Sequence, residues 1–191
     1  MSRKHFYEET FKNRDFSTEA FPEGEYECCL FEGCNLEHVD LSEIRFLESE
    51  FVDCNLSNVK LNGTALQEVR FKDCKMLGLL FEQCKDFGFE VSFEHCQLNH
   101  SSFYQVQLTR CLFQGCQLEE VDFTESVLRE ARLKACDLRN AIFENTDLEK
   151  ADFRTSFNYS INPELNQIKG AIFSMPDVIG LLDKYPIQIE E

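Results

Sequence analysis

The chain has 191 residues, a formal net charge of −16 at pH 7 and 43% hydrophobic residues. So acidic a chain repels nucleic acid and attracts basic surfaces, so we expect a protein partner, with neither direct nucleic-acid contact nor membrane binding. No run of 18 consecutive apolar residues occurs and the first five residues contain no apolar signal region, which predicts a cytoplasmic protein.

A large apolar residue recurs at every fifth position from Phe6 to Phe81, and again from Phe93 to Phe153. These runs supply 29 positions, of which 15 are Phe and 12 are Leu. Two residues before each of them, from Cys29 onward, the residue is nearly always small or β-branched. A period of five matches neither the 3.6 of a helix nor the 2 of a strand. It indicates a solenoid, whose units bury their apolar side by stacking on neighbours.

A chain that turns a corner every five residues can point the large and the small residue into one narrow interior. Four such sides close a coil of about 20 residues, and hydrogen bonding between coils sets a rise of about 4.8 Å. We therefore predict an all-β solenoid, a quadrilateral β-helix, over residues 1–156. A separate C-terminal segment follows over residues 157–191.

The ten cysteines are explained by the repeat. Eight of them occupy the small inward position, where cysteine acts as a small buried hydrophobic residue: Cys29, Cys34, Cys54, Cys74, Cys96, Cys111, Cys116 and Cys136. No pair has C-x-x-C spacing. We expect neither metal nor redox chemistry from them, and no cofactor.

Acidic residues 20 positions apart should stack on successive coils. Like charges held about 5 Å apart are unfavourable, so ordered acidic columns favour a basic partner that neutralises them. The alternative is that the charge only keeps the rod in solution. The candidate acidic face consists of Glu23, Glu43, Glu48, Asp53, Glu68 and Asp73.

The period slips by two residues between Phe81 and Phe93, at 82–92. Phe87 and Phe89 fall outside the register there, separated by a glycine that can adopt positive φ. Such an insertion either protrudes as a partner-binding loop or forms a corner with both rings tucked against the rod. The candidate loop residues are Glu82, Lys85, Asp86, Phe87, Phe89 and Glu90.

After Phe153 the pattern changes. Asn162 and Pro163 form a helix start, as N-cap and first helical residue, and a second start follows at 174–176. We predict a short α-helical cap, ending in a short strand, that covers the open last coil. Its remaining apolar surface should support a two-fold dimer. The cap and dimer candidates are Ile161, Leu165, Ile168, Ile172, Phe173, Val178, Leu181, Leu182, Ile187 and Ile189.

The repeat, written A(D/N)LXX, resembles the pentapeptide-repeat family. Units such as 34–36, 54–56, 136–138, 146–148 and 151–153 match it closely, and the resemblance spans about residues 6 to 155. What the resemblance implies is a right-handed quadrilateral β-helix with Phe and Leu stacked in columns.

The tail and three internal segments are similar to a narrower branch, the topoisomerase-protecting proteins. Residues 157–166 and 171–176 look like the C-terminal ends of Qnr quinolone-resistance, albicidin-resistance and microcin-immunity proteins. The segments 52–57, 68–78 and 91–96 are particularly similar to the albicidin-resistance type. This resemblance implies a DNA-mimicking rod that binds DNA gyrase or topoisomerase IV, protects it from quinolones or peptide toxins, and forms a homodimer through its C-terminal segment. This chain departs from the Qnr proteins of Gram-negative bacteria in one respect: its period breaks only once, whereas those proteins carry two loops.

No catalytic constellation is present in the sequence. The four histidines have no metal-ligand spacing, and no phosphate loop, nucleophile elbow or H-E-x-x-H motif occurs. A rod filled with side chains also offers no substrate pocket. We therefore expect no enzyme activity. The competing hypothesis to topoisomerase protection is a protein-interaction scaffold without a topoisomerase role.

Overall fold

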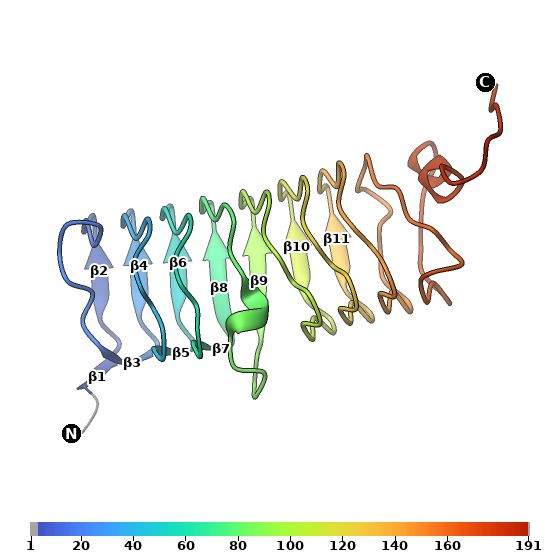
Figure 1. Ribbon diagram of the computed structural model, residues 1–191. Helices are drawn as coiled ribbons and strands as arrows, with labels where there is room; N and C mark the ends of the chain where they lie inside the picture. The colour runs from blue at the N-terminus through green and yellow to red at the C-terminus, as the bar shows by residue number, and fades with distance from the viewer. Residues whose placement is uncertain (1–3, 191) are drawn as a thin grey trace.

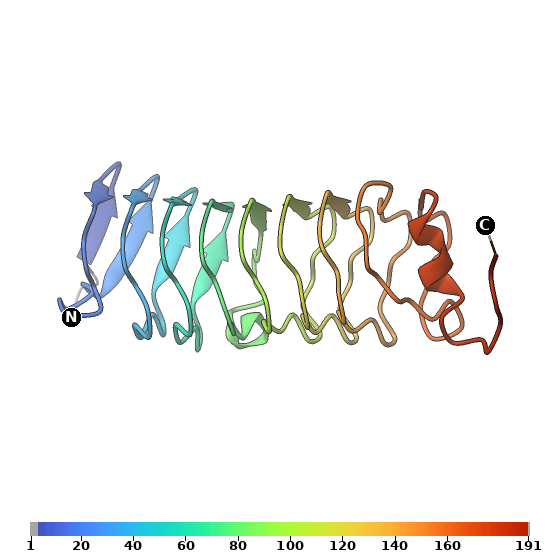
Figure 2. The same ribbon diagram turned by 90° about the horizontal axis from the view of Figure 1, so that it is seen from above.

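The structure, a computed structural model, describes residues 4–190 as a slender rod of stacked coils (Figures 1 and 2). Its strands pair in parallel, each with the strand one coil further along. Tyr26 lies opposite Phe46, and Phe31 lies opposite Phe51, so the register is the predicted 20 residues. The chain therefore forms the all-β solenoid that the period of five predicted. No helix within residues 4–190 has the length and apolarity that crossing a membrane requires.

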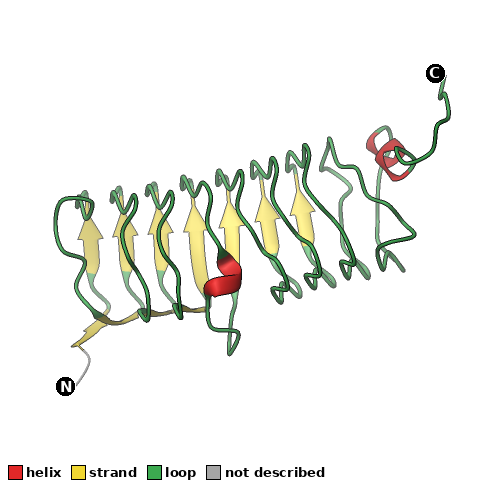
Figure 3. Ribbon diagram, in the orientation of Figure 1, coloured by secondary structure: helices red, strands yellow, loops and turns green. Residues whose placement is uncertain are grey.

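Each coil has four sides, and two of them carry regular strands (Figure 3). Face 1 is the four-stranded sheet of β1 (Lys4–Tyr7), β3 (Gly24–Glu27), β5 (Arg45–Leu47) and β7 (Ala65–Gln67). Face 2 is the seven-stranded sheet of β2 (Thr10–Lys12), β4 (Leu30–Glu32), β6 (Glu50–Val52), β8 (Val69–Lys72), β9 (Val91–Glu94), β10 (Leu112–Gln114) and β11 (Arg132–Lys134).

The other two sides are held by single parallel bridges. Face 3 runs from Asp15 through Asn35 and further coils to Phe157, and face 4 contains the bridges 40–60, 80–102, 102–122 and 122–142. Between faces the chain turns at a residue with left-handed backbone, such as Glu48 (φ 49°) and Asp53 (φ 53°). That conformation costs a residue other than glycine about 1–2 kcal/mol, so the stacking of the faces must offset it at every corner.

The large inward residues form continuous columns. On face 2, the ring centroids of Phe31 and Phe51 are 4.6 Å apart, and those of Phe51 and Phe71 are 5.2 Å apart. The small inward residues also bond the preceding coil: the Thr64 hydroxyl donates to the Leu41 carbonyl (2.8 Å), and the Cys54 thiol to the Phe31 carbonyl (3.4 Å). All ten cysteines are free thiols. The eight cysteines assigned to the small inward position are buried, which confirms their predicted packing role.

The break of phase changes face 1 and leaves face 2 intact. On face 2 the register lengthens to 22 residues, with Phe71 opposite Phe93. The insertion begins after the short 3-10 helix η1 (Phe81–Gln83). Phe87 is 88% exposed, whereas Phe89 is partly buried against the core, 6.5 Å from the Phe81 ring. One ring thus protrudes and the other is tucked against the rod.

The cap contains a helix, but not the predicted α-helices: the second predicted start, at 174–176, leads into a 3-10 helix, and the first leads into a turn. Among residues 4–190 the helices are two short 3-10 segments, η1 and η2 (Asp177–Leu181). The side-chain oxygen of Asn162 accepts a hydrogen bond from the Glu164 N–H (3.0 Å), as an N-cap does, but the following residues form only a turn. The expected strand at 187–189 is not formed either.

Coiling continues past the predicted boundary at residue 156. Gln167 pairs with Asp147 and Ile172 pairs with Asp152, each one coil apart. The Phe173 ring stacks on that of Phe153 at 5.3 Å. Hydrogen bonding to the preceding coil thus outweighs the local helix propensity of this segment. Helix propensity contributes little energy per residue, and tertiary contacts commonly override it.

Candidate partner-binding surface

The six candidate acidic residues are all exposed, but they lie on three corners of the rod and not on one face. Glu23 and Glu43 lie between faces 4 and 1, because the next residues along the chain enter β3 and β5. Between faces 1 and 2 lie Glu48 and Glu68, and between faces 2 and 3 lie Asp53 and Asp73.

Backbone bonds hold each corner over the next coil, as at Glu48, whose N–H donates to the Gln67 carbonyl (2.9 Å). The predicted columns therefore exist, and together they border faces 1 and 2.

Some of the rod's acids are paired with bases one coil away. Lys12 contacts Glu32 at 2.9 Å and Lys72 contacts Glu94 at 4.0 Å. The hydrogen bond from Arg110 lowers the pKa of the Glu130 carboxyl below its usual value. Such exposed pairs stabilise weakly, by up to about 1 kcal/mol, but they neutralise charge locally.

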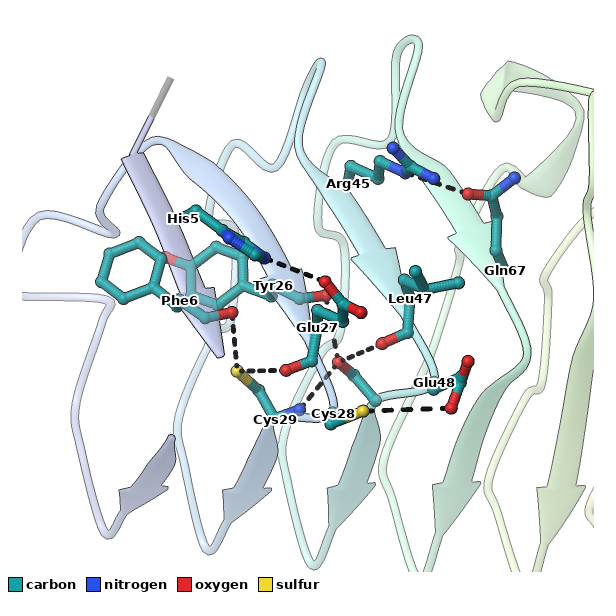
Figure 4. A network of polar contacts seen from close by, with 11 residues as sticks. His5, Phe6, Tyr26, Glu27, Cys28, Cys29, Arg45, Leu47, Glu48 and Gln67 are labelled. Carbon is teal, nitrogen blue, oxygen red and sulfur yellow. Dashed lines mark hydrogen bonds and ion pairs between the residues drawn. The ribbon is translucent and has the colours of Figure 1, made fainter. Parts of the chain in front are cut away.

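Five of the six candidate acids form no ion pair with any residue in 4–190: Glu23, Glu48, Asp53, Glu68 and Asp73. Around Glu48 the neighbouring side chains are shown in Figure 4. The Cys28 thiol lies 3.9 Å from its carboxylate, whereas Glu27 contacts His5 (3.0 Å) and Arg45 donates to Gln67 (3.0 Å). Glu48 thus has no basic partner, whereas the neighbouring Glu27 and Arg45 side chains both have partners.

Charge is also unevenly distributed around the rod, which the sequence reasoning missed. Of the residues that flank the inward centres, those of face 4 include four acids and one base, Lys60, whereas those of face 2 include six bases and four acids, Glu32, Glu50, Glu94 and Asp152. Sorting the outward residues by coil position would have found this pattern. On face 4 the acids are Asp40, Glu82, Asp122 and Glu144; on face 2 the bases are Lys12, Arg70, Lys72, Arg132, Lys134 and Arg154.

The loop candidates form one anchored projection at the end of face 1. The Lys85 N–H donates to the Thr64 carbonyl (2.8 Å), and the Glu90 N–H donates to the Leu66 carbonyl (2.9 Å). The Lys85 ammonium also contacts Glu43 at 2.8 Å, so the loop meets one of the acidic corners. Asp86 and Phe87 are exposed at the tip, and burial raises the pKa of Glu82 at the base above its usual value.

The C-terminal candidates separate into two groups. One group covers the last coil: Ile161 is 1% exposed, and Ile168, Phe173 and Leu181 pack against the core, with Val178 half-buried. The other group is exposed and unpartnered in the single chain: Leu165, Ile172, Leu182, Ile187 and Ile189. The residues that cover the last coil are therefore different from those that remain exposed.

The histidines lie on exposed outer positions. His100 contacts Glu120 at 3.1 Å, and His95 lies 3.8 Å from Glu94. Within the described part of the chain, no group of three or more His, Cys, Asp or Glu side chains is placed to hold a metal ion.

Comparison with known proteins agrees with this geometry. The family model described as pentapeptide repeat region matches residues 25–85 and 89–158, so its gap coincides with the loop. No curated protein matches the sequence.

Among solved structures, a trypsin-treated variant of QnrB1, a plasmid-mediated fluoroquinolone resistance protein, superimposes with a TM-score of 0.65 at 13% identity, over 98% of this chain and 100% of that one. A second trypsin-treated QnrB1 variant gives 0.53 at 17% identity, over 100% and 93%. HetL, a protein of the cyanobacterium Nostoc sp. strain PCC 7120 involved in heterocyst differentiation regulation, gives 0.44 at 13% identity, over 92% and 88%. At these identities the similarity concerns the fold.

Proposed function

Because the chain belongs to the pentapeptide-repeat family, we propose that it is a non-enzymatic DNA mimic that binds DNA gyrase or topoisomerase IV. Binding would protect the topoisomerase from quinolones or peptide toxins. The observation that carries this proposal is a set of exposed carboxylates without ion-pair partners, Glu48, Asp53, Glu68 and Asp73, repeated at the coil spacing.

A topoisomerase holds duplex DNA in a basic groove, where the phosphates release counterions on binding. A rod with acidic corners can replace the duplex there, since the basic groove supplies the partners that these carboxylates lack. The acidic outward residues of face 4 add to the same field, and the bases of face 2 oppose it.

The test is a pull-down with purified gyrase at low and high salt, together with supercoiling in the presence of a cleavage-stabilising toxin. Four of the unpaired acids are changed together: Glu48→Gln, Asp53→Asn, Glu68→Gln and Asp73→Asn. We expect gyrase affinity to fall about tenfold or more and its salt dependence to weaken, because fewer counterion-releasing contacts form.

A matched control removes four charges that already have partners: Glu32→Gln, Glu94→Gln, Glu130→Gln and Asp152→Asn. We expect this set to change affinity much less. Equal losses in both sets would mean that only total charge matters. Failure of saturating wild-type protein to change gyrase activity or toxin sensitivity would overturn the proposal.

The second candidate is an interaction scaffold without a topoisomerase role. The ion pairs between coils favour it, because they neutralise much of the acidic surface internally, and so does the exposed Phe87 ring at the loop tip. Phe87→Ala separates the two functions. A scaffold that recognises the loop loses its partner, whereas a charge-driven DNA mimic keeps most of its gyrase affinity.

The same proposal includes a homodimer through the C-terminal segment. Leu165, Ile172 and Leu182 are 50%, 44% and 39% exposed at the last coil. Sedimentation of the wild type and of an Ile172→Asp variant tests it, since a charge at that position should raise the dimer dissociation constant.

A further inference from the structure

The break of phase leaves a gap in face 1 beside the loop. After β7 the four-stranded sheet ends, and parallel pairing on this face resumes with the bridges 107–127, 127–147 and 147–167. Between the loop and Gln107 lies a cavity of about 240 Å³. Phe89, Leu108 and Leu112 contribute its apolar walls, and Ser92, Arg110 and Arg132 contribute its polar ones.

The cavity exposes an unpaired sheet edge. On the next coil the Val127 N–H donates to the Val106 carbonyl (3.0 Å), and the Val127 carbonyl accepts from Leu108 (2.8 Å). The corresponding N–H and carbonyl of Gln107 have no protein partner within residues 4–190. The Thr109 carbonyl also lacks the bond that its equivalent, the Arg129 carbonyl, receives from Arg110 (2.9 Å).

These three backbone groups are arranged to receive one extended segment. Adding a strand to a sheet edge supplies main-chain hydrogen bonds, and pockets for alternate side chains supply specificity. Here the apolar wall would take one inward side chain. Arg132 forms no ion pair with any residue that the structure describes. A carboxylate that follows the apolar residue of the bound segment could therefore pair with Arg132.

The chain contains one exposed segment of this chemistry. Residues 187–190 read Ile-Gln-Ile-Glu, and Ile187 and Ile189 are 55% and 56% exposed. Gln188, Ile189 and Glu190 repeat the outward, inward, outward order of a face-1 rung such as Gln107, Leu108 and Thr109. In Figures 1 and 2 the backbone of this segment runs beyond the last coil of the rod.

The segment cannot fill the gap of its own chain. Glu164 on the last coil holds Tyr185 (3.0 Å) and Lys184 (2.5 Å), so only residues 186–190 are free to move. Five extended residues span at most about 17 Å. Gln167 on the last coil is already three coil spacings, about 14 Å, from Gln107. The few ångströms of reach that remain are too short for the segment to pair along the Gln107 edge.

We propose that residues 187–190 of a second copy bind in the gap of face 1 as an added parallel strand. Ile189 would enter the apolar wall, Glu190 would contact Arg132 or Arg110, and the backbone would satisfy Gln107. The exchange is reciprocal in a two-fold dimer whose rods lie side by side, so that the last coil of each rod lies next to the gap of the other, because each rod has one tail and one gap. The inference rests on the proposed self-association and is independent of the topoisomerase proposal.

The test uses full-length protein in sedimentation equilibrium. We expect Ile189→Lys and Arg132→Glu each to raise the dimer dissociation constant about tenfold or more, because one places a charge in the apolar wall and the other opposes Glu190. The matched controls are Gln188→Lys, on the outward side of the same segment, and Lys134→Glu, on β11 outside the cavity. Both should change the constant less than about threefold.

A second measurement follows the Gln107 amide directly by hydrogen exchange. It should be protected in the dimer at high protein concentration and exchange freely in the Ile189→Lys variant. A synthetic peptide of residues 185–191 should restore protection to that variant.

A dimer that Ile172→Asp disrupts but that Ile189→Lys and Arg132→Glu leave intact would overturn this inference and retain C-terminal association. Protein that is monomeric at every concentration would overturn both. Peptide that leaves the Gln107 amide unprotected would also exclude the gap as its site.

Discussion

Faces 1 and 2 of the same rod respond differently to one two-residue insertion. Face 2 keeps seven strands in an unbroken sheet, and its Phe column passes the insertion with centroid distances of 5.2 Å before it and 5.4 Å across it. Face 1 stops after β7, forms the loop, and resumes as single bridges. Because each face bonds only to the coils above and below it, a change of length on one side need not reach the others.

Faces 1 and 2 therefore have different roles in the rod. Face 2 supplies continuous burial and hydrogen bonding, which keeps the coils in register. Face 1 can therefore lose pairing locally and present a projecting aromatic ring, a cavity and an open edge. Loops that carry binding groups generally depend on such a rigid scaffold.

The largest expected effect is from removing a ring in the continuous column. Phe93 is fully buried between Phe71 and Phe113, with centroid distances of 5.4 and 5.1 Å. We expect Phe93→Ala to lower the free energy of unfolding by about 3–5 kcal/mol, since it leaves a large cavity. Phe89→Ala on face 1 should cost clearly less, about 1–2 kcal/mol, because that ring is only partly buried. Equal losses in urea denaturation would contradict the difference between the faces.

A smaller effect is expected from repairing face 1. Deleting Asp86 and Gly88 together leaves Cys-Lys-Phe-Phe-Glu at this position, a regular repeat with Phe87 at the inward centre. We expect the free energy of unfolding to rise by about 1–2 kcal/mol, since the Gln107 backbone would gain two hydrogen bonds. Hydrogen exchange at that amide should slow in the monomer.

The control for this repair deletes Phe87 and Gly88. The period is the same, but Asp86 now occupies the inward centre, and a buried carboxylate without a partner destabilises. If both deletions stabilise equally, chain length and not the inward side chain governs the break.

The smallest effect concerns the end of the face-2 column, where Tyr159 packs beside Phe153 and Phe173. The Tyr159 hydroxyl is buried and has no hydrogen-bond partner within residues 4–190. Tyr159→Phe should therefore stabilise by about 1 kcal/mol, because it removes a desolvated polar group.

The pH dependence of stability gives a second readout for this variant. Burial, with a further contribution from Asp177, raises the pKa of Tyr159 from 10.0 to about 12. The unfolded tyrosine ionises first, so the stability that the neutral phenol contributes is complete below pH 10 and is lost as the pH rises toward 12. The difference between the wild-type and Tyr159→Phe profiles should grow over this range. Parallel profiles would contradict the assignment.

The sequence by itself determined the solenoid, its four-sided coil, the role of the cysteines and the place of the break, because the same five-residue period recurs in every coil. It also placed the acidic columns, since positions 20 apart must stack. It did not determine that Glu48 forms no ion pair while Glu130 does, because pairing depends on which base stands one coil away.

Only the tertiary structure decided the fate of the tail and of the loop. Asn162 and Pro163 carry a local helix signal, yet residues 167 and 172 continue the coil because the preceding coil offers backbone partners. Phe87 and Phe89 have the same side chain, and only the path of the loop over β7 makes one exposed and the other packed. The repeat pattern determines which residues form a coil, whereas hydrogen bonding to the preceding coil determines how far along the chain coiling continues.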